Sequence, residues 1–161
     1  MAARVVGQNY VYTQTQGTAA PYKLLESATT TIMQAPSTAG SSLADQMSGL
    51  NALPFGWTYY GVAVSGYYVS DNGYIAFDSS ASVAVNDSLP ATGGPNNAIY
   101  AFWDDIEIKE GANAVDKIVS WTYGSTPNRM HVIQWYSVTA GDTAVTSTIE
   151  PTFIYAAIRI Y

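Results

Sequence analysis

Hydrophobic and polar residues alternate along much of the chain with the period of two that is typical of β-strands. The alternation is clearest in residues 53–78, where Asn72-Gly73 separates two runs rich in aromatic and β-branched side chains. Asn-Gly favours a two-residue type I′ turn, because both central residues of that turn need a positive φ. We therefore predict a β-hairpin with a two-residue turn at the centre of this segment.

The length of this turn decides which side chains share a face of the hairpin. A two-residue turn pairs Asp71 with Tyr74 and each preceding residue with the next one along the second strand. One face would then carry Tyr67, Val69, Tyr74 and Ala76, and the other Tyr68, Ser70, Ile75 and Phe77. A shift of one residue would exchange the two faces and bury the other set.

The same alternation predicts further short strands separated by Gly, Pro and Asn turns. These strands comprise residues 9–15, 21–26, 29–33, 81–85, 97–109, 117–123, 130–138 and 152–161. Residues 35–49 predict a surface loop, although Ser42-x-x-Asp45 could cap one helical turn. No other segment favours a helix, so the chain is predicted to be a single all-β domain, residues 1–161, built as an antiparallel two-sheet β-sandwich.

The composition is poor in charged residues and rich in tyrosine. Charged residues make up 11% of the chain, and the 13 tyrosines outnumber the six lysines and arginines. This balance is typical of extracellular β-proteins, because tyrosine provides amphipathic surface without charge. The net charge of −6 argues against nucleic acid and against anionic membranes as partners. Without cysteine, disulfides, thiolate metal sites and thiol nucleophiles are excluded.

Neither a membrane span nor a signal peptide is evident. No apolar run approaches the ~20 residues that a membrane-spanning helix needs. The N-terminus, MAARVVGQNY, has no apolar core of the kind found in signal peptides. If the protein is exported, we expect its signal to be missing from this sequence.

Six motifs occur in a recognisable order within residues 50–161: LPFGWTYYG, VSDNGYIAF, LP, NAIYAFWDDIE, WTYGSTPNRMHVIQW and TFIYAAI. Together they resemble the jelly-roll-type β-sandwich domain of large secreted bacterial surface proteins, common in Bacteroidetes. The AFWDD segment also resembles the nidogen-like extracellular domain, in which an aromatic-Trp-Asp strand follows an Asn-Gly hairpin. The resemblance implies a jelly-roll-like fold and a secreted, non-catalytic module for cell-surface adhesion, display or assembly.

The chain departs from these domains at its C-terminus. In them the strand equivalent to TFIYAAIRIY is usually followed by a turn and one more strand, whereas this sequence ends at Tyr161. We expect the last strand either to be missing or to come from a partner. The domain could then accept a strand from another surface protein or from a copy of itself.

Asp104 and Asp105 are the residues that most strongly suggest a chemical function. Adjacent strand residues face opposite ways, so the two carboxylates cannot form a catalytic dyad. Asp104 falls on the more apolar face, and we expect it to be buried and paired with Arg129. Alternatively, Asp104 or Asp105 could bind Ca²⁺ together with Asp71, Asn72 or Asp78, since Ca²⁺ prefers oxygen ligands.

Other catalytic chemistry has little support in the sequence. His131 is the only histidine and no G-x-S-x-G motif is present, so a serine triad and a multi-histidine metal site are not expected. We expect His131 to be a structural strand residue near Trp135. Gly93-Gly94-Pro95 predicts a turn, because neither the lysine nor the helix of a phosphate-binding loop follows it.

Aromatic residues on the predicted strands suggest an alternative function. A platform for stacking sugar rings could form from Trp57, Tyr59, Tyr67, Trp103 and Trp121. The alternative to an adhesion module is therefore a carbohydrate-binding module of a secreted hydrolase, with polysaccharide as its partner. An independent glycosidase is a third reading, which requires two carboxylates facing each other in a groove.

Overall fold

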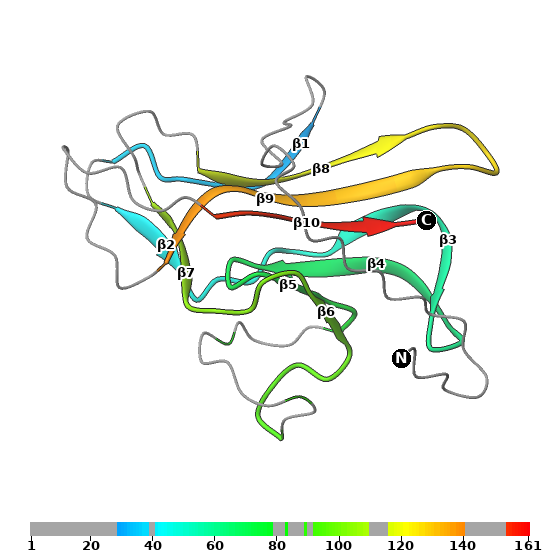
Figure 1. Ribbon diagram of the computed structural model, residues 1–161, viewed down its shortest axis with the longest axis horizontal. Helices are drawn as coiled ribbons and strands as arrows, with labels where there is room; N and C mark the ends of the chain where they lie inside the picture. The colour runs from blue at the N-terminus through cyan, green and yellow to red at the C-terminus, as the bar shows by residue number, and fades with distance from the viewer. Residues whose placement is uncertain are drawn as a thin grey trace, which may run out of the picture.

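Two antiparallel β-sheets make up the part of the chain that the computed structural model describes, which is residues 29–38, 41–78, 83, 89, 92–109, 116–140 and 154–161 (Figure 1). The predicted all-β, two-sheet architecture is confirmed. The predicted strands 9–15 and 21–26, and almost all of 81–85, lie outside the described residues. Within these residues, no helix has the length and apolarity needed to cross a membrane.

The first sheet has six strands and is centred on its longest one, β9. Its strands are β1 (Thr30–Gln34), β2 (Ser42–Ala44), β7 (Ile106–Lys109), β8 (Lys117–Tyr123), β9 (Met130–Ala140) and β10 (Ile154–Ile160). The order is β1-β8-β9-β7-β2, and β10 also pairs with β9. β9 pairs with β7 through Thr139 and Ala140, just beyond Ser137, which has a φ of 63°. The alternative of a helical turn at Ser42-x-x-Asp45 is wrong, because β2 starts there and pairs with β7.

The second sheet has four strands in the order β3-β4-β5-β6. They are β3 (Asn51–Tyr59), β4 (Val62–Ser70), β5 (Tyr74–Ala76) and β6 (Ala98–Tyr100). Tyr59 pairs with Val62, so Tyr60 and Gly61 form a two-residue turn, with φ values of 48° and 78°. The turn type predicted for Asn72-Gly73 therefore occurs one hairpin earlier.

The predicted register of the Asn72-Gly73 hairpin is wrong by one residue. Ser70 pairs with Tyr74, and Val69 pairs with Ile75, so the turn contains three residues. Asn72 is fully buried in this turn, where its Oδ1 accepts a hydrogen bond from the N–H of Ile106 at 2.9 Å. The longer turn places Asn72 among core contacts. As a consequence the side chains of the second strand change face, so that Ile75 rather than Tyr74 lies on the same face as Val69.

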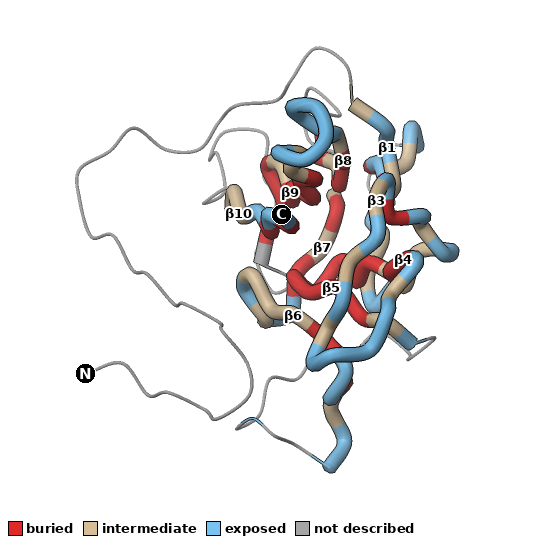
Figure 2. The backbone as a smooth tube through the Cα atoms, turned by 90° about the vertical axis from the view of Figure 1, so that its right-hand side faces the viewer, coloured by how far each residue is buried: buried red, intermediate tan, exposed pale blue. Residues whose placement is uncertain are grey.

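Each face of this hairpin belongs to a different cluster. The main core lies between the sheets and includes Tyr67, Val69 and Ile75 from the second sheet, with Ile118, Ile133 and Trp135 from the first. Figure 2 shows the buried positions along β9, β4 and β5. A smaller cluster on the other face of the second sheet contains Tyr74, Ala76 and Ala98, with Met47, Tyr100 and Trp103 packed against it.

The predicted strand 97–109 is divided between the two sheets. Its first part is β6 and its last part is β7, and residues 101–105 connect them. The N–H groups of Ala101 and Phe102 both donate to the carbonyl of Gly73, at 2.9 and 3.1 Å. These bonds turn the chain out of the strand before Asp104, so strand alternation does not apply to that residue.

Candidate functional site

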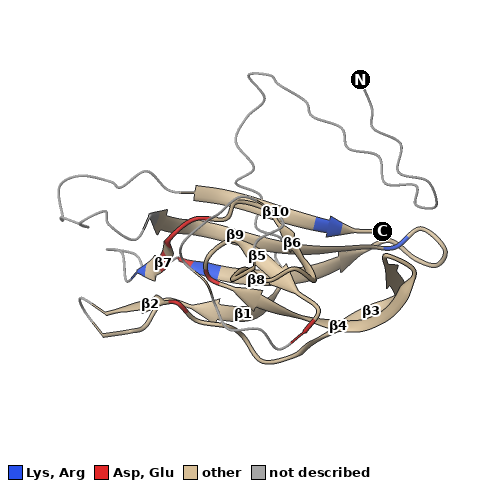
Figure 3. Cartoon of the chain, turned by 90° about the horizontal axis from the view of Figure 1, so that it is seen from below, with Lys and Arg blue, Asp and Glu red and all other residues tan. Residues whose placement is uncertain are grey.

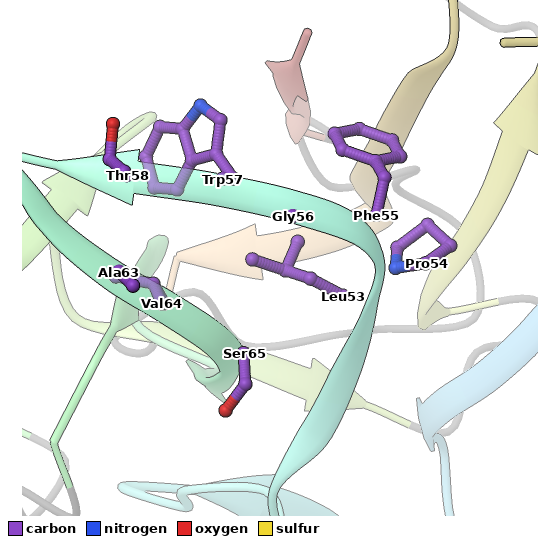
Figure 4. A pocket seen from close by; sticks show the side chains of 9 residues that line it. All are labelled: Leu53, Pro54, Phe55, Gly56, Trp57, Thr58, Ala63, Val64 and Ser65. Carbon is purple, nitrogen blue, oxygen red and sulfur yellow. The ribbon is translucent and has the colours of Figure 1, made fainter.

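An opening in the second sheet is the most distinctive local feature of the structure. Ala52 pairs with Gly66 and Trp57 pairs with Val64, so four residues of β3 stand opposite Ser65 alone. We call residues 53–56 the arch (Figure 4). Pro54 has no N–H to donate to a neighbouring strand, which favours such a departure from regular pairing.

The arch frames an open hollow of about 800 Å³. Its lining consists of Leu53, Pro54, Phe55, Gly56, Trp57, Thr58, Ala63, Val64 and Ser65. None of these residues is charged, and Phe55 and Trp57 provide the aromatic surface. The ring of Trp57 stacks on that of Tyr59, with centroids 5.8 Å apart and planes 27° from parallel. The hollow can therefore hold a neutral, partly apolar group.

Arg129 ties the arch to the first sheet. It precedes β9, and its Nη1 donates to the carbonyl oxygen of Pro54 at 3.0 Å. Its guanidinium carbon also lies 5.1 Å from the centre of the Phe55 ring, a cation–π distance. Arg129 thus satisfies an arch carbonyl and packs against the ring of Phe55.

The predicted buried ion pair of Asp104 with Arg129 is wrong. Asp104 is exposed, and its Oδ1 accepts a hydrogen bond from the N–H of Asp105 at 2.9 Å. The chain leaves the β-strand before Asp104, so this side chain does not face the core. In the described part of the chain, the ion pair that forms is Lys109 with Glu107, at 3.5 Å.

The residues considered for Ca²⁺ do not converge. Asp71 is buried, and its Oδ2 accepts a hydrogen bond from the N–H of Gln46 at 2.9 Å. Asn72 is bonded to Ile106 and to Asp45, whereas Asp104, Asp105 and Asp78 are exposed. Among the described residues, no three His, Cys, Asp or Glu side chains form a group that could hold a metal ion.

His131 joins the two sheets through its ring nitrogens. Its Nε2 lies 2.7 Å from the hydroxyl of Tyr67 on β4, and its Nδ1 lies 2.9 Å from Oγ1 of Thr122 on β8. Burial lowers the pKa of His131, and burial raises the pKa of Tyr67 to about 12. Both groups are therefore neutral near pH 7, as expected for a structural contact. A cavity of about 370 Å³ adjoins them and is also lined by Pro54 of the arch.

The five aromatic residues predicted for sugar stacking do not form one surface. Trp57 and Tyr59 lie together beside the arch. Tyr67 is fully buried, and Trp103 belongs to the smaller cluster, where its Nε1 donates to the carbonyl of Val83 at 2.9 Å. Trp121 lies near Tyr123 on the first sheet, with the two rings nearly perpendicular.

Neither the arch nor the role of Arg129 was predicted from the sequence. Pro54 and Gly56 were the available signal, because both residues weaken regular pairing when they occur within a strand. No local sequence pattern indicated which group Arg129 would contact. A bond from an arginine to a main-chain carbonyl 75 residues away depends on the tertiary fold rather than on local sequence.

Comparison with known proteins gives one match. The family model described as NIDO related matches residues 9–152, which is most of the chain. No curated protein and no solved structure matches. NIDO-related domains are extracellular and generally non-catalytic, in keeping with the expectation drawn from the AFWDD segment. On the strength of this match, the chain belongs to the NIDO-related family.

Proposed function

We propose that this domain is a non-enzymatic module, secreted or displayed at the cell surface, that supports adhesion or assembly by accepting a strand from a neighbouring molecule. The neighbour is a copy of the same chain or another surface protein. The observation that carries this proposal is the outer edge of β10.

β10 pairs with β9 along Ile154–Ile160, and no other described strand pairs with it. The strand contains one charged residue, Arg159, and no proline. Natural sheets usually protect such an edge with charges, prolines or bulges that discourage pairing with another chain. The pairing of β10 with β9 has a register shift between Ile154 and Ala156. From Ala156 to Ile160 the pairing is regular, which favours the addition of a further strand, in which main-chain hydrogen bonds supply the affinity.

Two proline substitutions test this proposal. Neighbouring residues of a β-strand direct their N–H groups to opposite sides, so only one of Ala156→Pro and Ala157→Pro removes an N–H from the edge that faces away from β9. That variant should keep its fold and lose self-association or adhesion, measured by light scattering and by aggregation of cells that display the domain. The other variant loses a bond to β9 and should be destabilised by about 3 kcal/mol.

The unmodified protein provides a direct test of the proposal. It should associate with itself, or promote adhesion of the displaying cells, at micromolar concentration. A wild-type domain that stays monomeric and non-adhesive would overturn the proposal. So would a folded edge variant that associates as strongly as the wild type.

The hollow at the arch favours carbohydrate binding as a second candidate function. An uncharged lining with aromatic surface from Trp57 and Phe55 suits the apolar face of a neutral sugar. Binding of neutral polysaccharides, measured by affinity electrophoresis, should weaken in Trp57→Leu and persist in Trp103→Leu. Equal retardation of the two variants would argue against this candidate.

A further inference from the structure

The outer face of the six-stranded sheet, which faces away from the core, contains a groove of about 210 Å³. Its lining consists of Trp121, Tyr123, Met130, Val132, Gln134, Ala157 and Arg159. Trp121 and Arg159 are both paired directly with Val132, one from each side. The three residues therefore form a row across β8, β9 and β10, with buried Val132 as the floor between two walls.

The two walls differ in chemistry. The Trp121 side presents an indole ring, set nearly perpendicular to Tyr123 at 6.1 Å. Its Nε1–H is buried and has no hydrogen-bond partner within the described part of the chain. The opposite wall presents the exposed side chain of Arg159, whose guanidinium suits a planar carboxylate.

The three strands that form this face contain positive charge and no negative charge. β8, β9 and β10 together contain two cations, Lys117 and Arg159, and no aspartate or glutamate. Figure 3 shows the blue segments on β8 and β10. The net charge of the chain is −6, and an anionic ligand would meet no carboxylate from these three strands when it approaches Arg159.

We propose that the groove binds a carboxylate-bearing sugar unit, such as a uronic acid of an acidic polysaccharide. The sugar ring lies against the indole of Trp121, and the carboxylate pairs with Arg159. This inference goes beyond the adhesive role. It extends the carbohydrate alternative of the proposed function to a second surface and names its ligand.

The size and shape of the groove favour a sugar over an acidic peptide. At about 210 Å³ it is smaller than the ~300–1,000 Å³ of typical drug-sized pockets, which suits a single ring. A peptide strand would instead gain main-chain hydrogen bonds at the β10 edge. An aromatic wall and a charged wall on opposite sides match the apolar face and the carboxylate of one uronic acid.

The test compares trigalacturonate with its methyl ester, which is the same sugar without the charge. Titrations at low salt, followed by tryptophan fluorescence and NMR, should show the ester binding about tenfold more weakly or worse, because a charge-assisted bond is lost. Arg159→Gln should bind acid and ester equally. Trp121→Phe should weaken binding of both, and thermal melts would verify that each variant is folded.

Phe102→Leu is the control, because it removes an exposed aromatic ring that lines neither the groove nor the arch hollow and should leave trigalacturonate binding unchanged. Binding that does not distinguish acid from ester, or that survives Arg159→Gln in full, would overturn the proposal. The same holds if neither sugar binds at millimolar concentration, or if an oligoglutamate peptide competes as well as trigalacturonate. None of these results tests self-association or the binding of neutral sugars at the arch. Each of the three proposals can therefore be refuted without affecting the others.

Discussion

Asp116 and His131 are buried ionisable residues whose pKa values are shifted by burial. Asp116 lies just before β8, and burial raises its pKa from 3.8 to about 6, although bonds from Ser137 and from the backbone of Lys109 oppose the rise. Its Oδ1 has no hydrogen-bond partner within the described residues. Each shift affects the free energy of unfolding in a defined pH range.

Replacing Asp116 with asparagine should stabilise the protein at neutral pH. Between pH 3.8 and about 6 the folded state binds more protons than the unfolded state, so stability falls as pH rises through this range. Above pH 6 the raised pKa of Asp116 lowers the free energy of unfolding by about 3 kcal/mol. Urea denaturation at pH 7.5 should show Asp116→Asn to be more stable by about 1–3 kcal/mol. The exposed control Asp104→Asn should change stability by no more than about 0.5 kcal/mol.

His131 should make the stability of the protein depend on pH below neutrality. Its pKa is lowered in the folded state, so the unfolded state binds more protons as pH falls below the ordinary value of 6.5. Stability is therefore fully present above pH 6.5 and is lost as pH decreases. In the Asp116→Asn background, adding His131→Gln should lower stability at pH 7.5 but flatten its dependence on pH between 5 and 6.5. An equally steep pH dependence without the histidine would contradict this assignment.

At the scale of elements, the sequence predicted most strands and failed where tertiary contacts override local pattern. Period-two alternation located β1, β8, β9 and β10 within a few residues. It could not show that Asn72 would be buried, because burial depends on the N–H of Ile106 from another strand. For the same reason Asp104 was assigned to a strand that in fact ends at Tyr100. The candidate site was predictable only in part. Strand alternation places Trp57 and Tyr59 on one face, but it does not predict the arch.

Gly73 is the residue that makes the three-residue turn feasible. Its φ is +83°, and a Cβ at this position would lie 1.7 Å from the carbonyl oxygen of Phe102. Gly73→Ala must therefore move the backbone of a neighbouring segment, and we expect it to destabilise the protein by more than about 3 kcal/mol. Gly93→Ala, where no atom lies within 4 Å, is the control and should be nearly neutral. Thermal unfolding of the two variants would decide, and a similar midpoint for both would refute this account of the turn.

At the scale of the whole molecule, a few polar contacts link the two sheets across an otherwise apolar core. Tyr67 meets His131, Arg129 reaches Pro54, and Nε1 of Trp135 donates to the carbonyl of Ser70 at 2.9 Å. Directional contacts of this kind define how the sheets are placed relative to each other, which apolar packing alone specifies less strictly.

Removing the guanidinium of Arg129 should loosen the arch before it unfolds the protein. Arg129→Ala loses one charged hydrogen bond and one cation–π contact, and we expect a cost of about 1–2 kcal/mol. Hydrogen exchange should accelerate at the amides of Leu53, Phe55 and Gly56, with little change in β5. Ser125→Ala, in the turn that precedes Arg129, is the control. Unchanged exchange in the arch would show that Arg129 does not hold it.

The central position of β9 has a consequence for how the protein is made. β8, β10 and β7 are all held in the first sheet through this one strand, which begins at Met130. A nascent chain that has emerged from the ribosome only as far as residue 129 contains β3–β6 and can form that sheet. The first sheet still lacks β9, the strand with which β7, β8 and β10 pair. That intermediate exposes one side of the finished sheet, so we expect chaperones to engage the chain until β9 emerges. A stalled ribosome releasing the chain at residue 129 would therefore yield an aggregation-prone product, whereas the full-length chain buries the same surface.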